Sequence, residues 1–358
     1  MNRKRISMHI NGMGVISAQP TYDNSVFLPS INQFDDNVMP SVHPDFKEYI
    51  NPVQLRRLSR MLRIGLTAAT ICVRDSEISK PDGVITGSGF GFLGETAKFL
   101  GEILQQNEMQ LTPTYFMQST YNALSGLIAL TLKCQGHNNA FVGRGHAFET
   151  AVHDAYFNLQ TESSNFLVGA FDEADPVDFK VLSRVGHYKK DKVNNLNLFE
   201  SNTAGTLQGE SAAFFMLGKL PGEKSWAKIE DVQIVYSPSN TDELIDYTKK
   251  FLNENNISIY DLDLVIHGQS GDPKKDRLTL ETAEALFDKN AQARFKHLSG
   301  EYCTSTSFAW WLSVMILKKQ FVSELVRSNA ISPDNLKLIL ILNHYQGKNY
   351  SLSLMRSI

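Results

Sequence analysis

The sequence TPTYFMQSTYNALSGLIALTLKCQGHNNAFVGRGHAFETA occupies residues 112–151, and from it we begin to predict the fold. Its segment Tyr121 to Leu132 is small and apolar around nearly the whole helical circumference, which predicts a helix buried in the core or at a subunit interface. A short strand, Ala140 to Val142, follows. After it a helix from His146 to Leu159 places apolar residues three and four positions apart. This order of a strand followed by a helix indicates an α/β unit.

The flanking segments extend the same pattern. On the N-terminal side a strand, an irregular stretch, a helix with one buried face, a glycine-rich strand and a second helix are predicted, and two apolar strands come later in this half. These segments are Ile6–Ser17, 18–51, Pro52–Arg74, Val84–Thr86 with the GSGFGFLG run after it, a helix through Leu104, Phe166–Ala170 and Ala212–Leu217.

The second part of the chain repeats this organisation from Ala227 onward. Strands and helices alternate, and a helix rich in aromatic and small residues again follows a short strand, which predicts two duplicated α/β halves around mostly buried sheets. The expected strands are Ile229–Tyr236, Leu264–His267, Leu338–Leu342 and Ser351–Met355, and the expected helices are Asp242–Glu254, Thr279–Leu286 and Ser305–Lys318. We therefore divide the chain into halves at residues 1–220 and 221–358.

Composition and charge exclude several classes of protein. The net charge of -3 argues against a nucleic-acid partner, because no excess of cations is present to bind phosphates. The three cysteines are scattered, which argues against a disulfide framework or a zinc site. The basic opening, residues 1–5, leads into no apolar run, so a signal peptide is not expected, and the longest apolar stretch, 308–317, is too short to span a membrane. We expect a cytoplasmic protein.

Six motifs occur along the chain in one particular order. Besides residues 112–136, they are NGMGVIS at 11–17, ITGSGFG at 85–91, LVGAFDE at 167–173, QGESAAFFML at 208–217 and IHGQSGDPKKD at 266–276. In this order they resemble the β-ketoacyl-acyl-carrier-protein synthases (ketosynthases) of the thiolase fold. The resemblance implies a layered αβαβα architecture, with residues 1–220 similar to the family's N-terminal half and 221–358 to its C-terminal half.

The catalytic residues of that family are not retained. An active member carries the acyl chain on a cysteine where the nucleophile helix begins, and the equivalent position is Gly145. Shifting the alignment by one residue places Arg144 or His146 at this position. His146 is therefore an alternative candidate for the nucleophile. The family's first histidine corresponds to His267, whereas the second is replaced by Glu301. Without the nucleophile, condensation is not expected. In addition, an ionised carboxylate at position 301 cannot donate a hydrogen bond to an enolate.

Each of these positions also has a structural interpretation. His267 can be a structural histidine of its loop, and Lys296 with Glu301 can form a buried ion pair that replaced the old site. The C-terminal segment NHYQGKN, 343–349, retains the family's asparagine as Asn343 and an aromatic residue as Tyr345, but it is shorter than the family's glycine-rich loop. We interpret the whole site as vestigial.

A ketosynthase-like chain without a nucleophile resembles the chain length factors, which pair with an active ketosynthase and help to enclose its acyl tunnel. By position, Phe116, Thr120 and Tyr121 are our candidates for the tunnel wall, with Asn122 beneath them. The alternative is that they are ordinary core residues.

A basic helix is the second candidate contact with a partner. In LRRLSRMLR, residues 55–63, we expect Arg56, Arg60 and Arg63 to share one helical face, where an acidic acyl carrier protein could dock. The alternative is a solvated face of an amphipathic helix.

Three functions remain open from the sequence. The first is a non-catalytic subunit that forms a heterodimer with an active ketosynthase in fatty-acid, polyene or polyketide synthesis. The second is a malonyl-carrier-protein decarboxylase or other acyltransferase that acts without a cysteine, and the third is a homodimeric acyl-binding protein. No metal or cofactor is expected in the chain itself, and substrates would be carried on the phosphopantetheine of a carrier protein.

Overall fold

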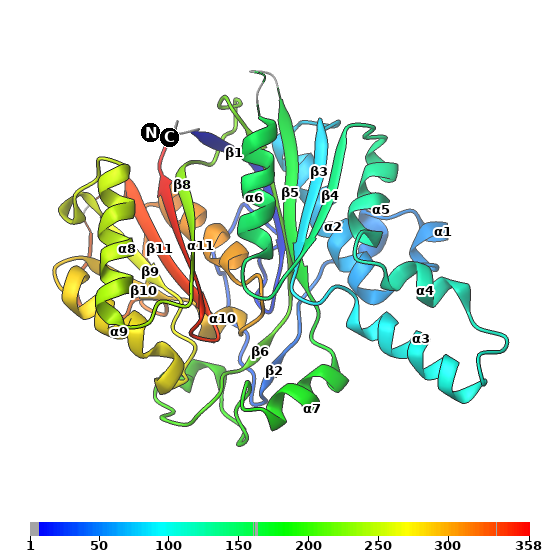
Figure 1. Cartoon of the computed structure of the whole chain (residues 1–358). Coiled ribbons are helices and arrows are strands. Elements are labelled where there is room, and N and C mark those ends of the chain that lie inside the picture. Colours follow the sequence, from blue (N-terminus) through cyan, green and yellow to red (C-terminus); the bar gives the residue numbers. More distant parts are fainter. Residues whose placement is uncertain (1–6, 160, 162–163, 334) are drawn as a thin grey trace.

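The computed structural model describes residues 7–159, 161, 164–333 and 335–358 (Figure 1). The basic opening and the first residue of the predicted strand Ile6–Ser17 lie outside this range. The strands are β1 (Met8–Ile16), β2 (Val38–Met39), β3 (Gly83–Ser88), β4 (His137–Val142), β5 (Asn165–Asp172), β6 (Gln208–Gly209), β7 (Ser211–Gly218), β8 (Ala227–Tyr236), β9 (Leu264–His267), β10 (Ala291–Arg294), β11 (Leu338–Tyr345) and β12 (Asn349–Arg356).

The helices alternate with these strands along the chain. They are α1 (Pro52–Leu55), α2 (Arg60–Ser76), α3 (Leu93–Gln105), α4 (Pro113–Ser119), α5 (Ala123–Leu132), α6 (Ala147–Asn158), α7 (Pro176–Arg184), α8 (Thr241–Glu254), α9 (Pro273–Phe287), α10 (Lys296–Ser299) and α11 (Thr306–Lys319).

The sheet has the same strand order in both parts of the chain. Ten strands follow the order β10-β9-β11-β12-β8-β1-β7-β5-β3-β4, so that β8 and β1 meet in the middle and β10 and β4 form the two edges. Read outward from the middle, each side has two antiparallel pairings and then two parallel ones. The predicted boundary between residues 220 and 221 falls between β7 and β8, the last strand of one side and the first of the other.

Side-chain alternation along the strands produces the layers. On β7, Ala213, Phe215 and Leu217 face one apolar cluster whereas Phe214 and Met216 face another, because successive side chains of a strand point to opposite sides. The central cluster contains α6 and α11, and the outer clusters contain α2 with α5 and α8 with α9. Figure 1 shows these layers from left to right. The predicted layered αβαβα architecture is confirmed.

The predicted single helix from Pro52 to Arg74 is wrong. The chain leaves the helical conformation after α1, and α2 starts only at Arg60, following an N-cap residue, Ser59, in an extended conformation. Gln118 of α4 stabilises this elbow, since its side chain accepts from the Ser59 N–H at 2.7 Å and donates to the Arg57 carbonyl at 2.6 Å. Backbone groups that a continuous helix would have satisfied are therefore bonded by a distant side chain.

The helix predicted over Tyr121–Leu132 is shorter and less buried than expected. α5 begins at Ala123, and while Leu124 and Ile128 are buried, the side chain of Leu130 is 77% exposed. The prediction that this helix is buried in the core of the chain is therefore wrong for the outer side of α5. Among the described residues, no helix has the length and apolar composition needed to cross a membrane.

Candidate functional site

Gly145, which the family resemblance aligns with the nucleophile, lies in the turn before α6. It is buried and has a φ of +89°, a conformation that residues with a side chain rarely adopt. A Cβ atom placed on it would lie 2.6 Å from the Cβ and 2.8 Å from the side-chain nitrogen of Asn349, the first residue of β12. A side chain of any kind at position 145 would therefore collide with the C-terminal hairpin.

A cysteine from the other half of the chain lies beside Gly145. The sulfur of Cys303 lies close to the Gly145 N–H and to the hydroxyl of Tyr345. The thiol is almost fully buried, and burial, followed by the nearby Asp172 carboxylate, raises its pKa well above the ordinary value. Because the thiolate is the nucleophilic form, this environment suppresses the reactivity of Cys303.

Asp172, at the end of β5, joins the two halves at this point. Its carboxylate accepts from the Gly89 N–H at 2.8 Å, and from the backbone N–H and the hydroxyl of Thr304 at 2.9 and 2.8 Å. Burial nevertheless raises the pKa of Asp172 to about 6. No local pattern indicates this role of Asp172, because the groups that donate to it come from segments far apart in the chain.

The space that remains at this centre is small. A cavity of ≈ 10 Å³ is lined by residues that include Asp172, Asp178, Gln208, Cys303 and Tyr345. That volume is about the minimum for one water molecule, so an acyl chain has no room here. Gln208 is buried and its side-chain oxygen has no hydrogen-bond partner among the described residues, which is consistent with a site for one water.

Lys296 and Glu301 form the buried ion pair that the sequence left open as an alternative. Their side chains are 0% and 1% exposed and lie 2.8 Å apart. The Lys296 ammonium also donates to the carbonyl of His344 at 2.6 Å. Glu301, which the family resemblance aligns with the second histidine, therefore neutralises Lys296.

His267 does not join this centre. On β9, Leu264 and Ile266 face the central cluster and Val265 faces the outer one, so alternation places His267 on the side covered by α9. Its ring lies 3.3 Å from the Ser328 hydroxyl, and burial, followed by the charge of Arg294, lowers the pKa of His267 to about 4. His267 is thus a neutral histidine, and its hydrogen bond goes to a serine side chain rather than to loop backbone.

The structure pairs a different histidine with a carboxylate. The His344 ring lies 3.0 Å from Asp276, which also accepts from the Ser270 and Gly271 N–H groups at 2.8 Å each. Sequence reasoning missed this pair, although His344 stands within the NHYQGKN segment. The pair stabilises the loop after His267 rather than a reaction centre.

The C-terminal segment forms a tight hairpin instead of a glycine-rich loop. β11 ends at Tyr345 and β12 begins at Asn349, which leaves a three-residue turn. The Asn343 side chain donates to the Thr306 hydroxyl at 2.9 Å. Asn343 and Tyr345 are both buried, so their side chains are part of the packing between the hairpin and α11.

The four candidate tunnel residues do not belong to the core of the chain. The side chains of Phe116 and Tyr121 are 55% and 56% exposed, and Asn122 is exposed and lacks a side-chain cap bond to α5. Tyr121 packs against Gly91, where an added Cβ would lie 2.5 Å from the ring. Because Gly91 lines the small cavity, Tyr121 lies between that cavity and the outer surface.

The predicted basic helical face is wrong. Arg56 lies in the elbow before α2, so it does not share a helical face with Arg60 and Arg63. Arg60 forms a double hydrogen bond with the buried carboxylate of Glu210 at 2.5 and 2.6 Å, and Arg63 donates to the Leu58 carbonyl. Although burial opposes it, the Arg60 guanidinium lowers the pKa of Glu210. Arg60 is a structural residue.

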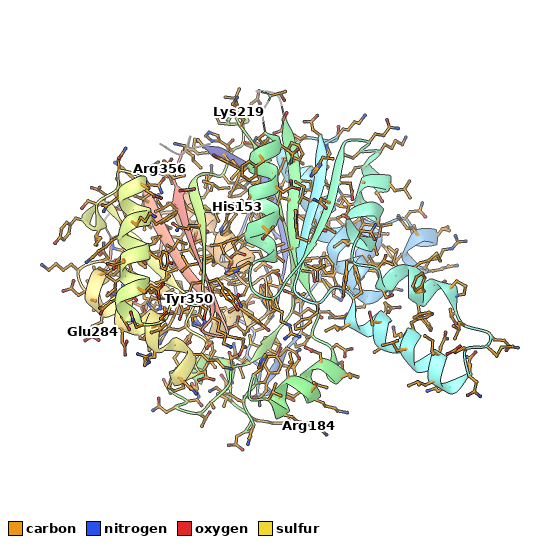
Figure 2. The ribbon with its side chains drawn as sticks, in the orientation of Figure 1. His153, Arg184, Lys219, Glu284, Tyr350 and Arg356 are labelled. Atoms are coloured by element: carbon orange, nitrogen blue, oxygen red, sulfur yellow. The ribbon has the colours of Figure 1, made fainter. Side chains whose placement is uncertain are left out.

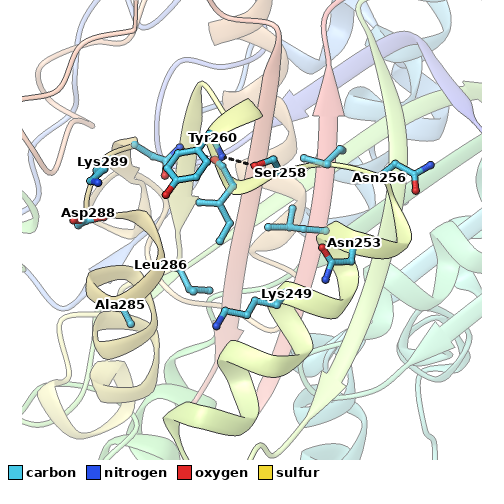
Figure 3. A pocket seen from close by; sticks show the side chains of 13 residues that line it. Lys249, Asn253, Asn256, Ser258, Tyr260, Ala285, Leu286, Asp288 and Lys289 are labelled. Carbon is cyan, nitrogen blue, oxygen red and sulfur yellow. Dashed lines mark hydrogen bonds between the residues drawn. The ribbon is translucent and has the colours of Figure 1, made fainter.

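A larger cleft lies at the opposite end of the molecule. It has a volume of ≈ 810 Å³ between the C-terminal ends of α8 and α9, with Lys249, Asn253, Asn256, Tyr260 and Lys289 around it (Figure 3). It is a surface cleft far along the sheet from Gly145, and none of the candidate site residues lines it. Within the described ranges, no group of three or more His, Cys, Asp or Glu side chains is arranged to hold a metal ion.

One protein family matches part of the chain. Residues 33–189 match the family model described as beta-ketoacyl synthase, N-terminal domain. The chain is ketosynthase-like. No curated protein matches its sequence.

Solved structures extend the likeness to the whole ketosynthase-like chain. It is 15% identical to a chain of the ishigamide ketosynthase/chain length factor, with a TM-score of 0.81 and coverage of 99% and 100% of the two chains. It is 13% identical to a chain of the ketosynthase ApeO in complex with its chain length factor ApeC from Xenorhabdus doucetiae, with a TM-score of 0.72 and coverage of 99% of this chain and 98% of that one. It is 16% identical to a chain of AntDE:AntF, a type II polyketide acyl-carrier protein in complex with its ketosynthase, with a TM-score of 0.70 and coverage of 99% of this chain and 100% of that one. These likenesses confirm the predicted fold.

Proposed function

We propose that this chain is a non-catalytic subunit that pairs with an active β-ketoacyl synthase and shapes the tunnel for the growing acyl chain. One observation carries the proposal: the nucleophile position, Gly145, has neither a side chain nor room for one beside Asn349. Cys303, the nearest thiol, is buried with a raised pKa beside a cavity of ≈ 10 Å³. Condensation would have to take place on a partner.

The edge of the sheet supports pairing with another subunit. Among the described strands β4 pairs only with β3, and its sequence, HNNAFV, has no lysine, carboxylate or proline to discourage association with another strand. The neighbouring surface exposes several large apolar side chains, and such a surface is typical of a protein interface. They are Phe116, Met117, Tyr121, Leu130 and Val142.

The position of Tyr121 supports a role in the tunnel wall. Its ring contacts Gly91 on the inner side and is 56% exposed on the outer side, next to the same apolar surface. A partner that covered β4 and α5 would bury Tyr121 and Phe116 at the junction. The volume of these side chains would then set how far an acyl chain of the partner can extend.

The names of the similar structures supply the class of partner. The ApeO structure is named as a ketosynthase with its chain length factor, and AntDE:AntF as an acyl-carrier protein with its ketosynthase. For the present chain we infer an active ketosynthase as partner and carrier-bound acyl groups as the substrates of the complex.

Co-expression with a cysteine-bearing ketosynthase from the same organism tests this function. The pair should form a complex and make an acyl product, and enlarging Thr120 or Phe116 to Trp should shorten that product while the complex still forms. Release of CO₂ from malonyl-carrier protein by the chain alone would instead indicate the decarboxylase. A stable homodimer that excludes the ketosynthase would indicate the acyl-binding protein.

A further inference from the structure

Helix α7, which the sequence did not predict, lies at the bottom of the molecule in Figure 1, below the strands of the first half. Asp175 caps it by accepting from two backbone N–H groups, and Pro176 follows at a position where a proline fits well. Its inner side is anchored by buried Leu182 and by Phe179, whose ring stacks on Tyr188 with 5.3 Å between centroids. α7 is thus a fixed element of the surface.

The outer side of α7 is apolar, which is unusual for the exposed face of a helix. Val177, Val181 and Val185 are 56%, 55% and 66% exposed, and their spacing of four residues aligns them in one row. Valine is a poor helix former because its branched side chain loses rotamer freedom, so solvent exposure alone does not favour it at these positions. Three such residues in a row form a ridge that packing against another protein would bury.

Two cations stand beside this valine ridge. Lys180 and Arg184 are exposed and precede Val181 and Val185 by one position each, so they lie along the same side of α7. Neither forms an ion pair or a side-chain hydrogen bond within the described parts of the chain. Figure 2 shows the Arg184 side chain directed away from the body of the protein.

We propose that this face of α7, consisting of the valine ridge with Lys180 and Arg184, docks an acidic amphipathic helix of the acyl carrier protein. The proposal rests on the proposed function, from which the carrier is inferred as a partner. A row of residues at i, i+4 and i+8 spans about 12 Å of helix, and ridges of that kind pack into the grooves of a second helix. Acidic side chains beside the groove would pair with the two cations, which specifies an acidic partner.

The elbow arginines are the alternative docking surface for the carrier. There Arg60 is already bonded to Glu210, and only Arg56 and Arg57 are exposed without a side-chain partner within the described residues. These two line an open cleft of ≈ 900 Å³ beside α4 rather than a row of apolar side chains. α7 combines free charge with an apolar ridge, so it fits an amphipathic helix better.

Docking at α7 would not lead to chemistry in this chain. Asp178 on the inner side of the helix lines the ≈ 10 Å³ cavity near Cys303, which is too small for an acyl group. The α7 face would instead hold the carrier near the complex, from which the phosphopantetheine arm serves the partner ketosynthase.

The test measures binding of a fluorescently labelled apo acyl carrier protein from the same organism to the full-length chain, by anisotropy at about 50 mM salt, where surface charges are weakly screened. Lys180→Glu/Arg184→Glu should raise the Kd at least tenfold, and Val177→Ala/Val181→Ala about threefold to tenfold. The charge-matched control Lys249→Glu/Lys289→Glu, at the distant cleft of Figure 3, should stay within twofold of the wild type. Unchanged thermal unfolding confirms that each variant is folded.

Other results would overturn the proposal. The proposal fails if both α7 variants bind the carrier with a Kd within twofold of the wild type. A large loss of affinity in Arg56→Glu/Arg57→Glu alone would place the carrier at the elbow instead. No measurable binding by the wild type would exclude the carrier as the occupant. Failure of the chain to pair with a ketosynthase, with carrier binding still sensitive to Lys180 and Arg184, would overturn the subunit function and leave the docking face standing.

Discussion

Asn349 fills the space that a side chain at position 145 would need, since a Cβ on Gly145 would lie 2.6 Å from the Asn349 Cβ. The two residues come from opposite halves of the chain and meet at the position that the family resemblance aligns with the nucleophile. Restoring the cysteine is therefore not a simple reversal.

Gly145→Cys should destabilise the protein by about 2 to 4 kcal/mol, because it combines a steric overlap with a positive φ. Adding Asn349→Ala should recover part of this loss by removing the overlap. Neither variant should form an acyl-enzyme, since the neighbouring cavity of ≈ 10 Å³ leaves no room for an acyl chain. Urea unfolding and intact-mass measurement after incubation with acyl-carrier protein test both statements. Acyl loading of the single variant would show that the site is intact after all.

Lys296→Met should destabilise the protein by about 3 to 5 kcal/mol, because it leaves the carboxylate of Glu301 buried without its partner. Lys296→Met/Glu301→Gln should be clearly more stable than the single variant, since the unpaired charge is gone. Unfolding in urea measures the difference. A single variant that loses less than about 1 kcal/mol would mean that the pair does not balance buried charge.

Arg60→Ala should reduce stability, because Glu210 would lose the guanidinium that lowers its pKa. Arg56→Ala, which removes the same type of charge from an exposed position without a described partner, should change the unfolding free energy by less than about 0.5 kcal/mol. The comparison separates the structural arginine from the elbow arginine. Equal losses in the two variants would contradict the distinct roles assigned to them.

The stability of the protein should carry a pH dependence from Asp172. Its pKa is raised from 3.8 to about 6, so the native state binds the proton more tightly than the unfolded state. Stability from this group is therefore fully present below pH 3.8 and is lost as the pH rises through 6, which amounts to about 1 kcal/mol between pH 5 and pH 7. Asp172→Asn, although less stable overall, should lack that component. Urea unfolding at a series of pH values measures this dependence. If the unfolding free energies of the wild type and Asp172→Asn changed in parallel with pH, the assignment to Asp172 would be wrong.

Local pattern was enough to predict most of the fold. Phe166–Ala170 and Ala212–Leu217 are continuous apolar runs because both faces of their strands are covered, and the structure places β5 and β7 there. The elbow after Leu55 was missed because Gln118, 59 residues further along than Ser59, satisfies its backbone. α7 was missed because its exposed valines do not give the pattern of a helix with one buried face.

The candidate site was only partly predictable for a similar reason. The absence of a nucleophile at Gly145 and the Lys296–Glu301 pair follow from residue identity and short spacing. The approach of Cys303 to Gly145 depends on how the two halves pack, which no local pattern encodes. His267 was assigned by motif to the vestigial site, whereas the alternation of β9 turns it to the opposite face of the sheet.

The central claim is that this chain is the inactive member of a heterodimer. Native mass spectrometry of the co-expressed pair, combined with CO₂ release from malonyl-carrier protein, tests it most directly. We expect a complex with one copy of each subunit and CO₂ release that requires the cysteine of the partner, with no release from this chain alone. CO₂ release by the isolated chain would contradict the claim. So would a partner ketosynthase that never associates with this chain and is as active without it as with it.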